Sequence, residues 1–269
     1  MLFRFFLLCC LGLPLAATAS YTALRDGESL RYQVSWGIFP RAAEVVIAAR
    51  REIVDGRPFF RVTMDTASRG LVRALYSYDD RAEALIDEAT GRIVHARQQS
   101  RNIDITSDSE TKFDYDKRLV THRDTVRPGR NRDFPIPDGE PVDLLSALVG
   151  TRDWQLPPGE KRATLIFTGN DVYPLSIYAE KIESVRTPQG WQNALLLSPR
   201  METVEPRGVF RRGGEIKVWV SQEGERQPVR MQLKLKVGIA VLTLVERKIT
   251  PAETRVAGTK FPSPATSPQ

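Results

Sequence analysis

Most of the chain consists of short runs in which apolar and polar residues alternate, separated by turn-forming residues. Clear examples lie at residues 29–36, 59–65 and 215–220. Successive side chains of a β-strand point to opposite faces, so this period of two predicts strands with one buried face. The turn residues between the runs, as in VDGRP at 54–58, predict hairpins of antiparallel strands.

The cleanest alternation lies near the C-terminal end of the chain, at residues 229–237. One face of this predicted strand carries Val229, Met231, Leu233, Leu235 and Val237, and the other carries Arg230, Gln232, Lys234 and Lys236. Gly238 is a turn signal, and residues 239–245 form a second apolar run. We therefore expect a hairpin here, with the whole apolar face, Leu235 included, buried in the core.

One segment interrupts the β pattern. Residues 127–141 are rich in proline and glycine, which predicts a surface loop. Residues 143–150 (DLLSALVG) follow and predict a short helix, with Asp143 as N-cap and Gly150 at its end. The predicted strands form two series around this loop and helix, and no long flexible linker separates them. We therefore expect a single β-rich domain over residues 20–249.

The expected fold class is all-β and mainly antiparallel. A strongly curved sheet or an open, β-barrel-like domain with one short helix is the first interpretation. A β-sandwich of two packed sheets is the alternative.

The N-terminal residues have a different pattern, typical of a secretory signal peptide. Arg4 precedes an apolar run, and Ala17-Thr-Ala19 forms a small-residue cleavage site, so residues 1–19 are the predicted leader. This apolar run is too short to span a bilayer, and no transmembrane segment is expected after cleavage near Ser20. Residues 250–269, rich in Pro, Thr and Ser, predict a disordered tail.

Cysteine content and charge narrow the function classes. Both cysteines, Cys9 and Cys10, lie in the leader, so the mature chain has no disulfide, thiol nucleophile or thiolate metal site. This composition fits the periplasm of a Gram-negative bacterium. The net charge is +6, but basic and acidic residues are interleaved, which indicates a mixed solvated surface. No nucleic-acid partner is expected.

Several fragments, taken in order, resemble an uncharacterised exported bacterial family known as domain of unknown function 3108 (DUF3108). The fragments are LRYQVSWG at 30–37, AAEV at 42–45, FDY at 113–115, DLLSALVGTR at 143–152, KVWVS at 217–221, QPVR at 227–230 and LKLKVG at 233–238. The resemblance implies a curved or barrel-like antiparallel sheet in a Gram-negative envelope, and it supplies no activity or catalytic residues. Phe39-Pro-Arg41 departs from the small residue expected after the first strand.

Candidate catalytic residues are sparse. The two histidines, His95 and His122, have no metal-binding spacing and fit positions on a sheet face. Ser146 lies in no nucleophile motif and fits a helix-capping turn with Asp143. Asp108, Glu110, Asp114 and Asp116 are separated by even numbers of residues, so they would point to the same face of a strand. Two of them could therefore form a pair of catalytic carboxylates, although a solvated acidic face is the favoured interpretation. We expect no catalytic site, metal or cofactor.

Aromatic residues occur in nearly every predicted strand, and a curved sheet can enclose an apolar groove. The candidates for lining such a groove are Trp36, Tyr76, Tyr78, Trp154 and Trp219. We therefore expect a non-enzymatic periplasmic binding or carrier module for a lipid or other hydrophobic ligand. The alternative is an envelope structural or assembly factor that contacts other envelope proteins. A third hypothesis is a carboxylate-dependent hydrolase, which would require several polar groups converging in one cleft.

Overall fold

The computed structural model describes residues 23–103, 106–168, 171–202 and 204–250. The predicted leader and all of the predicted tail except Thr250 lie outside the described residues. Within them, all fifteen strands belong to one sheet whose spatial order is β8-β7-β6-β5-β4-β3-β2-β1-β15-β14-β13-β12-β11-β10-β9. Strands that pair are therefore neighbours in sequence, except where β1 pairs with β15. The consecutive strands β8 and β9 do not pair and form the two edges of the sheet.

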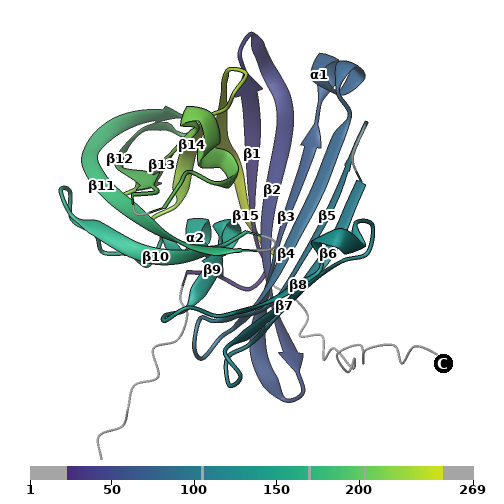
Figure 1. Ribbon diagram of the computed structural model, residues 1–269. Helices are drawn as coiled ribbons and strands as arrows, with labels where there is room; N and C mark the ends of the chain where they lie inside the picture. Colours follow the sequence, from purple (N-terminus) through teal and green to yellow (C-terminus); the bar gives the residue numbers. More distant parts are fainter. Residues whose placement is uncertain (1–22, 104–105, 169–170, 203, 251–269) are drawn as a thin grey trace, which may run out of the picture.

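The strands form two halves that meet at β1 and β15 (Figure 1). The first half comprises β1 (Glu28–Trp36), β2 (Phe39–Val54), β3 (Arg57–Ser68), β4 (Tyr78–Asp87), β5 (Ile93–Asn102), β6 (Thr106–Asp114), β7 (Leu119–Asp124) and β8 (Arg132–Pro135). The second half comprises β9 (Pro141–Asp143), β10 (Lys161–Phe167), β11 (Val172–Thr187), β12 (Gly190–Arg200), β13 (Glu215–Ser221), β14 (Pro228–Lys234) and β15 (Ile239–Ile249). Among these pairs only β9 and β10 run parallel. The antiparallel curved sheet is confirmed, and the sandwich alternative is not what forms.

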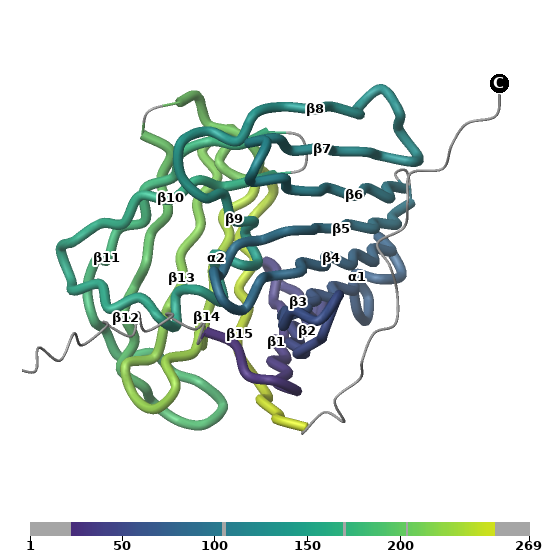
Figure 2. Tube along the Cα trace, turned by 90° about the horizontal axis from the view of Figure 1, so that it is seen from below, coloured from purple at the N-terminus to yellow at the C-terminus, as the bar shows by residue number. Residues whose placement is uncertain are grey.

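Two α-helices and two 3-10 turns complete the described chain. They are α1 (Gly70–Leu75), α2 (Leu144–Gly150), η1 (Pro128–Arg130) and η2 (Gly208–Gly213). The helix predicted at 143–150 forms as α2, and the Asp143 carboxylate caps it by accepting the backbone N–H of Ser146 at 2.5 Å. The sheet curls around α2, which lies between the two halves (Figure 2).

The core fills the space that the curved sheet encloses. Tyr32 of β1 and Val62 of β3 are fully buried from the first half, as are Leu195 of β12 and Val220 of β13 from the second. The Tyr32 hydroxyl donates to the Pro228 carbonyl at 2.9 Å, so the buried tyrosine also links the two halves. Burial of alternating side chains on the inner face of most strands is consistent with the curvature of the sheet toward a common interior.

A buried ion-pair cluster adds a second link between the halves. Arg152, which follows α2, donates to the Glu28 carboxylate of β1 at 2.5 and 3.2 Å. Arg247 of β15 also donates to Glu28, at 2.7 Å, and it pairs with Glu225 of the β13–β14 turn. The Glu28 and Arg152 side chains are only 2% and 5% exposed. Removing one partner would leave a buried charge without compensation.

The sheet has two distinct ends. The upper end, as drawn in Figure 1, holds the β1–β2 turn, α1, the C-terminal end of β5 and the β14–β15 turn. The lower end holds both ends of the described chain, where the Thr250 N–H donates to the Gly27 carbonyl at 2.9 Å.

Two predictions about local structure are wrong, and one helix was not predicted. Residues 127–141 are not only a loop, because they contain η1 and the edge strand β8, which pairs with β7. Helix α1 was not predicted at all. Finally, β14 ends at Lys234, so Val229 and Met231 are buried as expected but Leu235 and Val237 are exposed. A tight turn around Gly238, whose φ is +78°, ends the alternation there.

Candidate functional site

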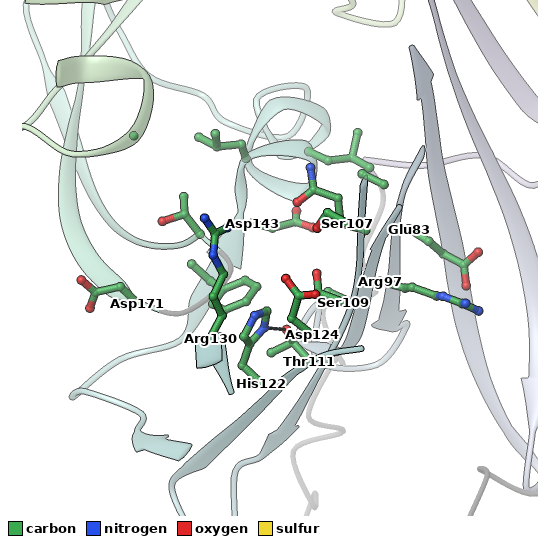
Figure 3. A pocket seen from close by; sticks show the side chains of 18 of the residues that line it. Glu83, Arg97, Ser107, Ser109, Thr111, His122, Asp124, Arg130, Asp143 and Asp171 are labelled. Carbon is green, nitrogen blue, oxygen red and sulfur yellow. Dashed lines mark hydrogen bonds between the residues drawn. The ribbon is translucent and has the colours of Figure 1, made fainter. Parts of the chain in front are cut away.

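The candidate site is a cavity of about 540 Å³ between the inner face of β3–β7, the N-terminus of α2 and the η2 turn (Figure 3). The first half of the sheet therefore provides one wall, and segments of the second half provide the opposite wall. The volume falls within the range of small-molecule sites, which is about 300–1,000 Å³.

A row of hydroxyl groups lines the sheet wall of the cavity. Every second residue of β6 points inward: these are Ser107, Ser109 and Thr111, followed by the buried Phe113. Phe113 packs edge-on against Phe167 of β10, with ring centroids 5.1 Å apart. Because the strand has a period of two, burial of Phe113 places the three hydroxyls on the inner face as well.

His122 of β7 lies beside this row. Its Nδ1 atom is 2.8 Å from the Thr111 hydroxyl, and its side chain is buried. Burial lowers the pKa of His122, and the positive charges of Arg123 and Arg130 lower it further against the effect of Asp124. The imidazole is therefore neutral at neutral pH, and it supplies a polar wall group without adding charge.

Asp124, at the end of β7, anchors one side of the cavity mouth. Its carboxylate accepts the backbone N–H groups of Val126 and Arg127 at 3.0 and 2.8 Å, and the Arg127 Nε–H at 3.0 Å. Burial by itself raises the pKa of Asp124, but the hydrogen bonds from Arg127 and Val126 outweigh it and lower the pKa overall. Arg127 is also held by the Ser107 hydroxyl at 2.6 Å, so this guanidinium is fixed in place.

Four arginines surround the cavity mouth, and they differ in their partners. Arg127 pairs with Asp124, and Arg207 pairs with Asp171. Arg130, the last residue of η1, and Arg211, in η2, are exposed and have no ion-pair partner among the described residues. The mouth therefore presents two guanidinium groups that are free to bind an anion.

The remaining wall is apolar. Met64 of β3, Leu144 and Leu145 of α2, and Phe167 of β10 line the cavity opposite or beside the hydroxyl row. Burial raises the pKa of Asp143, which caps α2 at this wall, against the lowering effect of its hydrogen bond from Ser146. The cavity thus combines a cationic mouth, a hydroxyl-lined face and an apolar face.

Some charged residues of the bordering strands do not contribute to the interior. The charged ends of Glu83 and Arg97 point away from the cavity in Figure 3, and they pair with Arg61 and Asp108 on the outer face. Asp108, Glu110 and Asp114 of the predicted acidic cluster lie on that outer face, where they contact Arg97, His95 and Lys117. None of these three carboxylates reaches the cavity.

The two histidines are on opposite faces of the sheet. The β5–β6 register pairs His95 with Lys112, whereas the β6–β7 register pairs His122 with Thr111, the neighbour of Lys112. Adjacent residues of a strand point in opposite directions, so the two imidazoles cannot meet. Within the described part of the chain, no group of three or more His, Cys, Asp or Glu side chains is arranged to hold a metal ion.

The structure does not bring the five predicted groove aromatics together. Trp36 donates its Nε1–H to the Val237 carbonyl at 2.7 Å, at the upper end of the sheet. Tyr76 and Tyr78 stack on each other, with ring centroids 6.4 Å apart. Trp154 lies under the Arg162 guanidinium at 5.0 Å, and Trp219 donates to Glu183 at 2.6 Å and contacts Arg230. None of the five lines the cavity described above.

Comparison with known proteins identifies the family. The family model described as "Protein of unknown function (DUF3108)" matches residues 31–245. The chain belongs to this family. The match extends from within β1 to within β15, so it includes all or part of every strand and every residue that lines the cavity. No curated protein matches the chain.

Among solved structures, this DUF3108 chain is similar to a β-barrel-like protein of domain of unknown function DUF1849 from Brucella abortus. The two are 8% identical, with a TM-score of 0.54, over 83% of this chain and 98% of that one. A weaker likeness is to a candidate lipoprotein from Parabacteroides distasonis, which is 11% identical with a TM-score of 0.32 over 85% of this chain and 98% of that one. Another is to an exported Bacteroides fragilis protein with a YmcC-like fold, which is 11% identical with a TM-score of 0.31 over 83% of this chain and 96% of that one. The first likeness shows a shared fold and nothing about function.

The described part of the chain contains no helix with the length and apolar character needed to cross a membrane.

Proposed function

We propose that this DUF3108 protein is a non-enzymatic binding or carrier module whose cavity takes an amphipathic ligand with an anionic group, such as a lipid. The observation that carries the proposal is the pairing of two uncommitted guanidinium groups, Arg130 and Arg211, with an apolar wall in one cavity. The predicted leader at residues 1–19 supports an exported, periplasmic location.

Each wall of the cavity suits one part of such a ligand. Arginine binds carboxylate and phosphate groups through paired N–H donors, so the mouth suits an anionic headgroup. The Ser107, Ser109 and Thr111 hydroxyls suit polar atoms next to that headgroup, and they can donate or accept. Met64, Leu145 and Phe167 offer an apolar surface for a hydrocarbon chain.

The alternative of an assembly factor acting through sheet edges has less support. The edge strands β8 and β9 contain only four and three residues. Edges this short present few unpaired backbone groups, and a partner strand would gain little from pairing with them. A cavity inside the curved sheet fits ligand binding better than edge-to-edge contact.

The hydrolase alternative has one favourable observation, because several polar groups do converge in this cavity. However, each carboxylate there already has a structural bonding partner. Asp124 accepts N–H groups from Val126 and Arg127, and Asp171 binds Arg207. Asp143 caps α2. Hydrolysis by paired carboxylates needs two such groups that both face the substrate, so binding is the better-supported function.

Titration of the mature protein with a fluorescent fatty acid tests the proposal. We expect saturable binding that oleate displaces and uncharged oleyl alcohol displaces much less. Replacing Arg130 and Arg211 together with alanine should weaken oleate binding by about tenfold or more per arginine, because hydrogen bonds to charged groups contribute about 1.5–3 kcal/mol each.

The matched control is Arg50→Ala with Arg186→Ala, which removes the same charge from exposed positions with no ion-pair partner among the described residues. This control should bind oleate like the wild type. Absence of any saturable binding, or equal losses in both double variants, would overturn the proposal. Turnover of an ester or glycoside that depends on Asp143 would show that the cavity is catalytic instead.

A further inference from the structure

Large apolar side chains are exposed at the upper end of the sheet, around the same end at which the cavity opens. We call this set the apolar rim, and it consists of Ile38, Leu71, Leu75, Ile103, Val237 and Ile239. Ile38 is 88% exposed, Leu75 67% and Val237 66%. Exposed apolar side chains that gather on one surface, unlike single ones, mark an interaction site.

Backbone contacts hold the segments of the apolar rim side by side. The Gly37 N–H donates to the Ile239 carbonyl at 3.4 Å, so the β1–β2 and β14–β15 turns touch. The Arg69 N–H donates to the Ala42 carbonyl at 2.8 Å, which fixes α1 beside the start of β2. Tyr78 pairs with Asn102, so Ile103 follows directly beside the connection that contains α1. Figure 1 shows α1 and these turns at the upper end.

The rim alternates with basic side chains. Arg41, Arg101 and Lys236 are exposed at this end and have no ion-pair partner among the described residues. The acids Glu44, Asp79 and Glu215 nearby each bind a base, namely Arg69, Arg73 and Lys234. One acid of this end, Glu205, has no ion-pair partner among the described residues. Among the described residues of the upper end, the charge without an ion-pair partner is therefore mainly positive.

The cavity mouth belongs to the same end. Arg130 follows the upper end of β7, and Arg211 precedes the start of β13, which pairs with the end of β14 just before the rim residues Val237 and Ile239. Both ends of the described chain lie at the opposite end of the sheet, where Thr250 bonds to Gly27. The rim is thus free of the described chain's own termini.

From this arrangement we propose that the upper end docks on an anionic phospholipid bilayer, with the apolar rim entering the headgroup region. Apolar side chains flanked by basic groups are the combination that binds anionic membrane surfaces, because burial and charge attraction add. Docking in this orientation faces the cavity mouth toward the bilayer. The inference goes beyond the proposed function and does not rest on it, because a surface can dock whether or not the cavity holds a ligand.

Co-sedimentation with vesicles of phosphatidylethanolamine and phosphatidylglycerol tests docking directly. At low salt the mature protein should sediment with these vesicles, and it should remain in solution with pure phosphatidylcholine vesicles. Binding should weaken as salt rises, because the Debye length falls to about 8 Å at 0.15 M ionic strength. Failure to sediment with anionic vesicles at low salt would overturn the proposal and leave a protein partner as the occupant of the rim.

Two pairs of variants identify the surface that docks. Ile38→Ser with Val237→Ser should weaken partition into the bilayer by about tenfold or more, because each substitution removes a largely exposed apolar side chain. Arg41→Gln with Lys236→Gln should weaken it by about fivefold per charge at low salt and have little effect at high salt. All four residues lie outside the cavity, so oleate titration should be unchanged in both variants.

The control pair is Trp191→Ser with Ile249→Ser, two exposed apolar residues at the lower end. It removes at least as much apolar surface but should sediment like the wild type. Equal weakening in the control and rim variants would contradict docking through the upper end. Docking and ligand binding can therefore fail separately, because the vesicle and oleate measurements use different variants.

Discussion

Replacing Glu28 with glutamine is expected to lower the free energy of unfolding by about 3–5 kcal/mol. The glutamine keeps the shape of the side chain but removes the charge that compensates Arg152, whose side chain is only 5% exposed. It also weakens the bond to Arg247 of β15 at the junction of the two halves. Urea denaturation followed by tryptophan fluorescence measures this loss.

Glu246→Gln is the matched control, because Glu246 pairs with Arg31 across the same β1–β15 junction but its side chain is 32% exposed, against 2% for Glu28. Exposed ion pairs contribute about 0–1 kcal/mol, so this variant should be nearly as stable as the wild type. Equal losses in the two variants would show that the Glu28 cluster is an ordinary surface ion pair.

The Glu28 cluster also predicts a pH dependence with a definite sign. Burial by itself raises the pKa of Glu28, but the hydrogen bonds and charges of Arg152 and Arg247 lower it below its ordinary value of 4.5. A pKa lowered by folding stabilises the folded state above the unfolded-state pKa, and this contribution disappears as pH falls through the folded-state pKa. Lowering the pH below 4.5 should therefore reduce the difference in free energy of unfolding between the wild type and Glu28→Gln.

Two substitutions on β14 and the turn after it should have opposite outcomes. Met231→Asp places a charge at a buried position that pairs with Leu242, whereas Leu235→Asp places the same charge at an exposed one. Burying an unpaired charge costs several kcal/mol, and the stability of a whole domain is only about 5–15 kcal/mol. Met231→Asp should be largely unfolded or insoluble, and Leu235→Asp should fold.

Soluble yield and circular dichroism distinguish these outcomes. Lys234→Asp serves as a second control because Lys234 is exposed and its loss breaks only a surface pair with Glu215. A folded Met231→Asp variant, or an unfolded Leu235→Asp variant, would mean that the inner face of β14 has been assigned incorrectly.

The alternation of side chains was enough to predict the curved sheet, because burial on one face is a property of each strand alone. It could not show where a strand stops. In β14 the pattern continues through Leu235 and Val237, but the turn at Gly238 ends the pairing at Lys234. Helix α1 was missed because its six residues are too few to show a helical period, and only Val72 among them is buried.

The cavity was missed for a different reason, although a signal was present. The charged residues Asp108, Glu110 and Asp114 were the obvious candidates in β6, but they lie on its outward face. The inward face of the same strand carries Ser107, Ser109, Thr111 and then Phe113. Because an aromatic residue such as Phe113 is expected in the core, the hydroxyls in register with it could have been placed inside. The arginines of η1 and η2, in contrast, meet only through folding over long sequence separations.

The most direct test of ligand binding is native mass spectrometry of the mature protein purified from the envelope of the producing bacterium. The account predicts an additional mass from an anionic, lipid-like molecule, present on the wild type and on Arg50→Ala with Arg186→Ala, and lost from Arg130→Ala with Arg211→Ala. A wild-type protein with no bound molecule, or the same bound molecule on Arg130→Ala with Arg211→Ala, would contradict a site in which these arginines bind an anionic amphiphile.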